Sequence, residues 1–300
     1  MAMQSSPAGV CLVHVRRVTG DRPLVTLCAI SPESGVNVAV LERLVKEHQL
    51  NRYNASFLLN FGEYQLLVVE APGVPAAELK TAVRWRIKDM LDFPVDDATV
   101  DVIDIPAGKN AQPRNRSLYA VAARNEVIRQ RMEDFDAAKL PVSVIDIPEL
   151  AQRNIASLLE DQGRGIALLS FDESGGLLTF SFEGELYSSR HIDVSLSQLN
   201  QPDSEQRQRQ FDRITLELQR SMDSFERQFS FITINKLVLA PLPPEVNLEA
   251  YLASNLYLPV STLNLDEIFD FSTVSGVGPH LRLQCFQALG AALRTEGVAQ

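Results

Sequence analysis

Strand-type and helix-type patterns alternate along this chain of 300 residues, and the alternation begins anew near its middle. A helical pattern ends before Asp161-Gln-Gly-Arg-Gly165, and an apolar strand pattern follows at once. Glycines placed between a helix and a new strand are typical of a boundary between structural units. The sequence therefore predicts two successive α/β halves, each with a mixed sheet and flanking helices.

The first half is expected to be rich in short elements. Asn60-Phe-Gly62 separates two strand patterns, at residues 55–59 and 64–70, and predicts a hairpin. Phe93-Pro94 should end the helix that begins near Pro75, because a residue before proline avoids helical geometry. The other strands are expected at 9–17, 24–30, 99–105, 118–122 and 142–147, and the helices at 38–50, 75–91, 126–139 and 148–160.

The second half restarts with three strand patterns that predict a meander, with Gly184 at one of its turns. A long helix follows over residues 204–229, with Ile214, Leu218 and Phe225 along one apolar face. The meander is expected at 166–171, 177–183 and 186–192, followed after the long helix by a strand at 236–240 and helices at 248–255 and 279–294.

The composition of the chain limits which partners it can bind and in which cellular compartment it is expected. The net charge of −10 disfavours general binding to nucleic acid, since phosphate backbones repel an acidic chain. The basic tract 109–116 is read as a solvated loop. Three cysteines without C-x-x-C spacing indicate a reducing compartment and no disulfide framework. We expect neither a secretory signal in residues 1–7 nor a membrane-spanning helix, and therefore a cytoplasmic protein.

No pattern in the sequence assigns an enzymatic reaction. The four histidines show no metal-ligand spacing, and the acidic pairs Asp96-Asp97 and Asp172-Glu173 are interpreted as charged turns. Ser275-Gly-Val-Gly-Pro279 precedes the last helix and has two interpretations. It is either an ordinary loop and helix entry or an anion cradle that includes Gly276 and Gly278.

Four segments, in order, resemble landmarks of the PilM-like proteins, which are actin-fold components of pilus and secretion machines. The strongest is the charged helix from Ala82 that ends at Phe93-Pro94 and leads into the strand before Val102. The others are the strand-turn-strand of 167–190, the Gln-Arg-Ser helix of 216–229 and the closing helix of 288–294. Within this family the chain looks most like the MshI branch, named for the mannose-sensitive haemagglutinin (MSHA) pilus, and more distantly like the cytoplasmic domain of GspL.

The resemblance implies an α/β, two-domain actin-like ATPase fold of the ribonuclease H-like type, as in PilM and FtsA, with mixed sheets and flanking helices. It implies a first domain over 1–160, with an inserted subdomain at about 36–124, and a second domain over 161–300. The last helix would pack back toward the first domain.

The resemblance also identifies where an actin-like ATPase would hold nucleotide, and here the glycine-rich turns are degenerate. The family pattern Gly-x-Asp-x-Gly falls on Gly9 to Val13, with Cys11 at the acidic position. In the second turn Ser170 stands at the acidic position, or, in a shifted register, Asp172 does. The third cluster is the proline-rich 240–244, which has few N–H donors. If nucleotide binding is retained, the candidate residues are Gly9, Asp172, Ser174, Gly175, Gly176, Gly276 and Gly278.

The helix before Phe93 is also the candidate docking surface. Trp85, the only tryptophan, is flanked by Arg84 and Arg86, and either packs on the domain core or anchors a partner. The resemblance implies a groove for the N-terminal peptide of a membrane-anchored PilN-like protein. The candidate partner-binding residues are Arg84, Trp85, Phe93 and Pro94.

Two functions are therefore expected as alternatives. The first is a non-catalytic scaffold at the inner-membrane platform of a type IV, MSHA-like pilus, held there by protein partners and linked to the assembly ATPase. It would need no metal or cofactor and would not insert in the membrane. The second is an active PilM-like protein that binds ATP and Mg²⁺ in pilus or type II secretion assembly.

Overall fold

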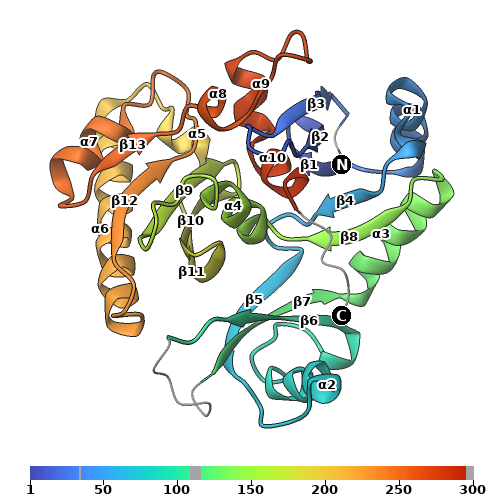
Figure 1. The fold of residues 1–300 in the computed structure, drawn as a ribbon, viewed down its shortest axis with the longest axis horizontal. Helices are drawn as coiled ribbons and strands as arrows, with labels where there is room; N and C mark the ends of the chain where they lie inside the picture. The colour runs from blue at the N-terminus through green and yellow to red at the C-terminus, as the bar shows by residue number, and fades with distance from the viewer. Residues whose placement is uncertain (34, 109–115, 295–300) are drawn as a thin grey trace. The chain divides into compact units, whose positions relative to one another are not determined.

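The computed structural model describes residues 1–33, 35–108 and 116–294 (Figure 1). The chain divides into two compact units, the first made of residues 1–35, 56–58 and 146–300 and the second of 36–55 and 59–145. Each unit has its own hydrophobic core. The basic tract expected as a loop lies outside the described residues except for Arg116. The expected division into residues 1–160 and 161–300 stays a prediction.

One sheet of the first unit is built around the N-terminus. Strands β1 (Ala2–Ser6), β2 (Gly9–Arg16) and β3 (Leu24–Ser31) form an antiparallel meander, and β4 (Ala55–Leu58) runs parallel to β1 on its other side. The residues of β2 from Gly9 to Val13 are all buried, as expected for a central strand covered on both faces.

The other sheet of the first unit repeats this plan. Strands β9 (Gly165–Asp172), β10 (Gly175–Phe182) and β11 (Glu185–Ile192) form a second antiparallel meander, and β12 (Ile234–Leu239) runs parallel to β9. The short β13 (Val260–Thr262) completes the order β11-β10-β9-β12-β13. Three short helices lie in the connections: α5 (Leu196–Leu199), α7 (Leu248–Asn255) and α8 (Leu265–Ile268).

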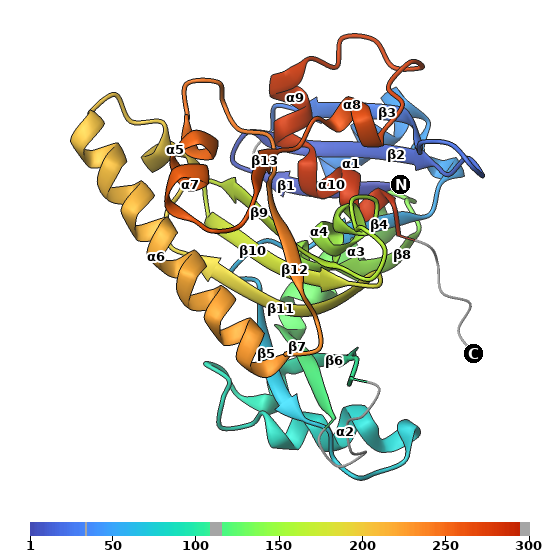
Figure 2. The same cartoon turned by 60° about the vertical axis from the view of Figure 1, so that its left-hand side comes forward.

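Helices cover both sheets of the first unit. The long α6 (Ser204–Gln228) lies along the β9–β11 meander in both ribbon views (Figures 1 and 2), with the ring of Phe225 stacked on Phe180 at 4.6 Å. Helix α4 (Pro148–Ala156) packs on the meander, and α9 (Pro279–Gln284) contacts β3 and α10 (Phe286–Ala292). Helix α10 packs against α4, β1 and β2. Gly290 permits this packing, because a Cβ atom there would lie 2.1 Å from the carbonyl oxygen of Ala151.

The second unit contains a three-stranded antiparallel sheet of order β5-β7-β6, formed by Tyr64–Glu70, Ser117–Arg124 and Ala98–Ile105. Helix α2 (Ala76–Arg86) covers one face, and Val83, Ile87 and Phe93 fill the core between helix and sheet. The short helix η2 (Val95–Asp97) leads into β6. The remaining elements are α1 (Val38–His48), η1 (Leu50–Arg52), α3 (Asn125–Ala137) and β8 (Val142–Asp146).

Most sequence-predicted elements are present, with several differences. The helix expected over 75–91 ends early, since α2 stops at Arg86, and the short α5, α8 and β13 were not predicted. The expected hairpin of residues 55–59 and 64–70 is wrong, because β4 pairs with β1 whereas β5 pairs with β7 in another sheet. The expected helix over 279–294 is interrupted at Cys285, so that α9 and α10 are separate. Strand β1 has no counterpart among the predicted elements. Of the helices within the described ranges, none combines the length and apolarity needed for a membrane span.

Candidate functional site

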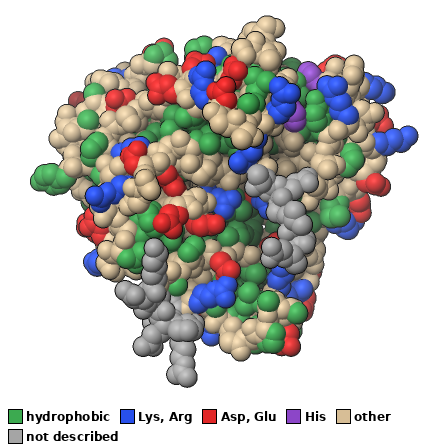
Figure 3. Space-filling view, viewed as in Figure 1, with side chains coloured by type: hydrophobic (Ala, Val, Ile, Leu, Met, Phe, Trp, Pro, Cys, Tyr) green, Lys and Arg blue, Asp and Glu red, His purple; other side chains and the backbone are tan. Residues whose placement is uncertain are grey.

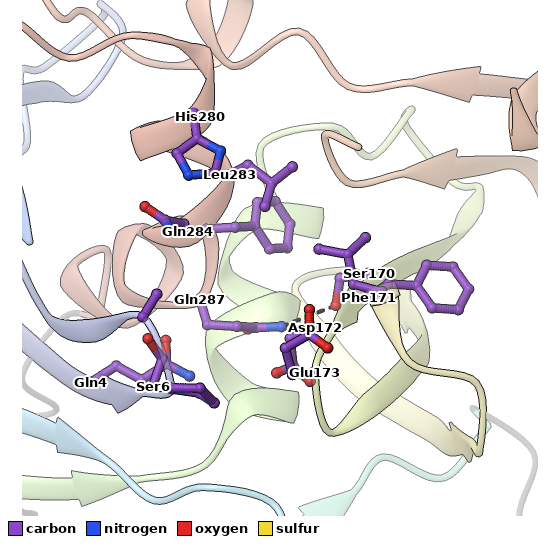
Figure 4. A pocket seen from close by; sticks show the side chains of 14 residues that line it. Gln4, Ser6, Ser170, Phe171, Asp172, Glu173, His280, Leu283, Gln284 and Gln287 are labelled. Carbon is purple, nitrogen blue, oxygen red and sulfur yellow. Dashed lines mark hydrogen bonds between the residues drawn. The ribbon is translucent and has the colours of Figure 1, made fainter. Parts of the chain in front are cut away.

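A cavity of about 200 Å³ in the first unit brings together three parts of the chain that lie far apart in sequence (Figure 4). Its walls come from the β1–β2 hairpin, the β9–β10 hairpin and the α9–α10 segment, with Leu196 of α5 beside them. The fourteen lining residues are Gln4, Ser6, Pro7, Ala8, Ser170, Phe171, Asp172, Glu173, Leu196, His280, Leu283, Gln284, Phe286 and Gln287.

The two hairpins that face the cavity are built alike. In the first, Ser6 ends β1 and pairs with Gly9, and in the second, Asp172 ends β9 and pairs with Gly175. The backbone of each glycine has nearly the same unusual φ, 134° at Gly9 and 137° at Gly175. This match makes Gln4 structurally equivalent to Ser170, and Ser6 equivalent to Asp172.

Both glycines are required by the packing of their own sheets. A Cβ atom on Gly9 would lie 1.9 Å from the carbonyl oxygen of Ser31 in β3, and one on Gly175 would lie 2.8 Å from that of Ile192 in β11. A φ near +135° is accessible only to glycine without strain. The fold alone therefore explains glycine at these two positions, whether or not a nucleotide binds.

The register expected for the first turn is wrong. Cys11 and Val13 lie inside β2, fully buried, rather than in a turn. The turn that reaches the cavity lies upstream of them, at Pro7 and Ala8. With this register the acidic position of the family pattern is Gln4 in the first hairpin and Ser170 in the second. Neither side chain carries a charge.

The carboxylate of Asp172 uses the hydrogen-bond donors of its own turn. Its Oδ1 atom accepts a hydrogen bond from the backbone N–H of Ser174 at 2.7 Å. Burial among protein atoms raises the pKa of the Asp172 carboxyl, although its side chain is exposed at the edge of the cavity, and hydrogen bonds from the N–H groups of Ser174 and Gly175 oppose that rise. The backbone N–H groups that would bind a phosphate in such a turn therefore already donate to the carboxylate of Asp172.

The floor of the cavity is a buried network of neutral polar side chains. Ser170 Oγ donates to Gln152 Oε1 at 2.7 Å, and Gln287 Nε2 donates to Ser170 Oγ at 3.1 Å. Gln152 in turn donates to the carbonyl oxygen of Leu168 and to Thr179 Oγ1. The Ser170 hydroxyl therefore ties α4 and α10 to the sheet and is not free to hold a metal-bound water.

The other glycines predicted for nucleotide binding lie outside the cavity lining. Gly176 packs against the ring of Phe171, which a Cβ atom there would approach to 2.6 Å. Gly276 and Gly278 precede α9, with open space around both. Ser174 contributes its carbonyl oxygen to a hydrogen bond with His191 Nε2 at 3.1 Å. Of the predicted nucleotide residues, the structure thus places Asp172 alone among those that line the cavity.

The donor set does not fit ATP with Mg²⁺. None of the fourteen lining residues is Lys or Arg, and the two charged ones, Asp172 and Glu173, are acidic. Phosphates need N–H donors or cations, and Mg²⁺ needs oxygen ligands such as the carboxylates that Gln4 and Ser170 lack. Within the described residues, no group of three or more His, Cys, Asp or Glu could hold a metal ion.

Sequence reasoning missed most of the cavity lining, including Gln4, Ser6, His280, Gln284 and Gln287. One signal was available for the first hairpin: a polar residue stands five positions before a glycine in both Gln4–Gly9 and Ser170–Gly175. The α9–α10 residues carry no such signal, because only the fold brings that segment to the hairpins.

The four predicted partner-binding residues, all in the second unit, have different environments. Phe93 is buried under the guanidinium of Arg124, 4.5 Å from its ring centroid, and is a core residue; it does not end α2, which already stops at Arg86. Arg84 Nη2 donates to the carbonyl oxygens of Val95 and Asp96 and holds η2 in place. Trp85, by contrast, is 60% exposed, so most of its side chain is available to a partner, and both alternatives for it stay predictions. Pro94 is exposed at the start of η2.

The raised pKa of Asp172 gives a stability prediction. Folding disfavours the ionised carboxyl, so its cost is present at pH 7 and disappears as the pH falls below the ordinary Asp pKa. The substitution Asp172→Asn, which keeps an acceptor for the Ser174 N–H, should raise Tm at pH 7 by about 2 °C or less. The gain should vanish in thermal melts near pH 3, and a lower Tm at pH 7 would contradict this assignment.

Comparisons with known proteins agree with the fold described above. Residues 36–180 match the family model described as type IV pilus assembly protein PilM. In fold, the chain is similar to a chain of the PilM-PilN type IV pilus biogenesis complex, with a TM-score of 0.73, 19% identity and 97% of each chain covered. No curated protein sequence matches the chain.

Two further structures support the fold class. One is the cytoplasmic domain of EpsL, an inner membrane component of the type II secretion system of Vibrio cholerae, with a TM-score of 0.50, 11% identity and coverage of 100% and 97%. The other is a Bacteroides thetaiotaomicron protein with an actin-like ATPase fold, with a TM-score of 0.50, 8% identity and 95% of each chain covered. Residues 36–180 are thus similar to PilM, and the chain has the predicted actin-like α/β fold.

Proposed function

We propose that this protein is a scaffold of the type IV pilus inner-membrane platform, of the MSHA-like kind, that docks a PilN-like membrane-anchored partner without turning over ATP. The observation that carries the proposal is the range of the family match. Residues 36–180 include the whole second unit, which contains the exposed Trp85. The part of the chain that matches PilM in sequence is thus the part with the candidate docking surface.

The cavity in the first unit supports the non-catalytic half of the proposal. The fold of an actin-like ATPase is kept, while Gln4, Ser170 and Asp172 replace the groups that would handle Mg²⁺ and phosphate. This favours a scaffold over the alternative of an active ATPase. In this proposal the protein lies at the cytoplasmic face of the inner membrane through its partners, and it links the platform to the assembly ATPase.

The surface charge is in keeping with protein partners rather than nucleic acid. On the face drawn in Figure 3, Lys and Arg side chains are interspersed with Asp and Glu and form no continuous basic area. Many of the basic side chains are already paired, as Lys80 is with Asp101 and Arg213 with Asp193. A net charge of −10 adds long-range repulsion of phosphate backbones.

The docking proposal predicts a large effect at Trp85. Tryptophan anchors at interfaces commonly contribute 2 kcal/mol or more, so Trp85→Ala should weaken binding of the N-terminal peptide of the PilN-like partner to the full chain by about tenfold or more. Calorimetric titration measures this directly.

Met132 offers a matched control, because it is also in the second unit and is 58% exposed. Met132→Ala should leave the affinity of the peptide unchanged. Equal affinities for Trp85→Ala and the wild type would reject Trp85 as the docking contact. Absence of peptide binding to the wild type would reject the docking proposal itself.

A further inference from the structure

The cavity of the first unit contains amide groups whose hydrogen-bonding capacity is unused. Gln4 is 7% exposed, yet its side chain makes no hydrogen bond within the described residues. Figure 4 shows its amide extending from β1 toward the side of the cavity where Asp172 and Glu173 lie. The side chain of Gln284 on α9, which is only partly buried, is also without a hydrogen-bond partner there. Because the Gln4 amide has no partner in the described part of the protein, only water or a polar ligand in the cavity can satisfy it.

The charges around the cavity determine the sign of that ligand. Within the described part of the chain, neither Asp172 nor Glu173 forms an ion pair with Lys or Arg. His191 interacts electrostatically with Asp172, and Glu173 accepts a hydrogen bond from the hydroxyl of Ser197. With no Lys or Arg in the lining, the site has no permanently charged cation to face the two carboxylates. A cationic donor would supply the missing charge. Its positive charge would also lower the pKa of Asp172 and so oppose the rise that burial causes.

The rest of the lining determines the shape of the ligand. Phe171, Leu283 and Phe286 give the cavity an apolar side next to the acidic hairpin. A bare metal ion would leave these surfaces without a partner, and no ligand group for a metal is present among the described residues. An aliphatic stem contacts such side chains well, and the rings of Phe171 and Phe286 add a favourable surface for a cation.

We propose that this cavity binds an organic cation, a primary ammonium or guanidinium group on a short apolar stem. The charged group lies between the carboxylates of Asp172 and Glu173, and the amides of Gln4 and Gln284 bind its remaining polar atoms. Two sources have this chemistry: a free small amine, or an Arg or Lys side chain of a protein partner.

The test is calorimetric titration of the full chain with four probes. Agmatine represents the free amine, N-acetyl-arginine amide represents a protein side chain, N-butylacetamide is a neutral control, and Mg·ATP tests the anion alternative. We expect binding of at least one cation and of neither control. Tighter binding of agmatine identifies a free amine, and tighter binding of the blocked arginine identifies a partner's side chain.

Variants assign the binding to this cavity. Asp172→Asn and Glu173→Gln should each weaken cation binding by about tenfold, since each removes one charged acceptor. Gln4→Leu should also weaken it, whereas Glu245→Gln, on an exposed loop of the same unit, should not. Absence of binding of both cations, equal binding of N-butylacetamide, or unchanged affinity in Asp172→Asn and Glu173→Gln would overturn the proposal. Binding of Mg·ATP would instead contradict the conclusion that the cavity does not fit ATP, and hydrolysis of the bound ATP would overturn the non-catalytic function, so the two failures are distinguishable.

Discussion

Substitution of Gly9 by alanine is expected to lower the free energy of unfolding by about 3 kcal/mol or more. The added Cβ atom would lie 1.9 Å from the carbonyl oxygen of Ser31, and alanine is strained at a φ of 134°. Neither backbone can yield without breaking the pairing of β2 with β3. Urea denaturation of the full chain measures the loss, and it should appear in buffer without nucleotide.

Gly276 provides the control, since it was also a candidate for nucleotide binding and has a positive φ of 75°. A Cβ atom at Gly276 meets no atom within 4 Å, so Gly276→Ala should cost only about 1 kcal/mol. If Gly9→Ala were as stable as the wild type, the conclusion that the fold itself requires this glycine would be wrong.

Substitution of Phe93 by alanine is the second large effect expected. The side chain is 8% exposed and packs with Val83 and Ile87 in the core of the second unit, under the guanidinium of Arg124. Its loss should destabilise this unit by about 3 kcal/mol or more, through lost burial and a cavity. Hydrogen exchange should show faster exchange in the amides of β5, β6 and β7.

Trp85→Ala separates stability from docking in the same segment. Because Trp85 is 60% exposed, its removal should change the free energy of unfolding by less than about 1 kcal/mol. A destabilisation as large as that of Phe93→Ala would mean that Trp85 belongs to the core. A loss of peptide binding in Trp85→Ala could then result from unfolding and would not identify a docking contact.

The sequence predicted the fold well where local patterns decide it. The meander β9–β11 and the long α6 follow from periodicity and from glycine signals, whereas α2 ends at Arg86, earlier than the proline signal at Phe93-Pro94 predicted. Strand β1 was missed because Ala2-Met3-Gln4-Ser5-Ser6 has neither alternation nor β-branched residues. Its place comes from pairing with β2 and β4, which is a tertiary effect.

The candidate site was less predictable for the same reason. The acidic position of the first turn was placed at Cys11, inside β2 and well after Gln4, because without β1 there was no hairpin in which to set the register. The false hairpin of β4 with β5 arose because neighbouring strands usually pair, and here the chain passes from one unit to the other between them. Gln284 and Gln287 reach the cavity only through the break between α9 and α10 at Cys285.

The central claim is that the protein docks its partner without nucleotide, and a single calorimetric experiment tests it. The full chain is titrated with the N-terminal peptide of the PilN-like partner, once in plain buffer and once after saturation with millimolar Mg·ATP. We predict the same dissociation constant in both titrations and no heat from Mg·ATP alone. Peptide binding that requires Mg·ATP, or that changes tenfold in its presence, would contradict the account.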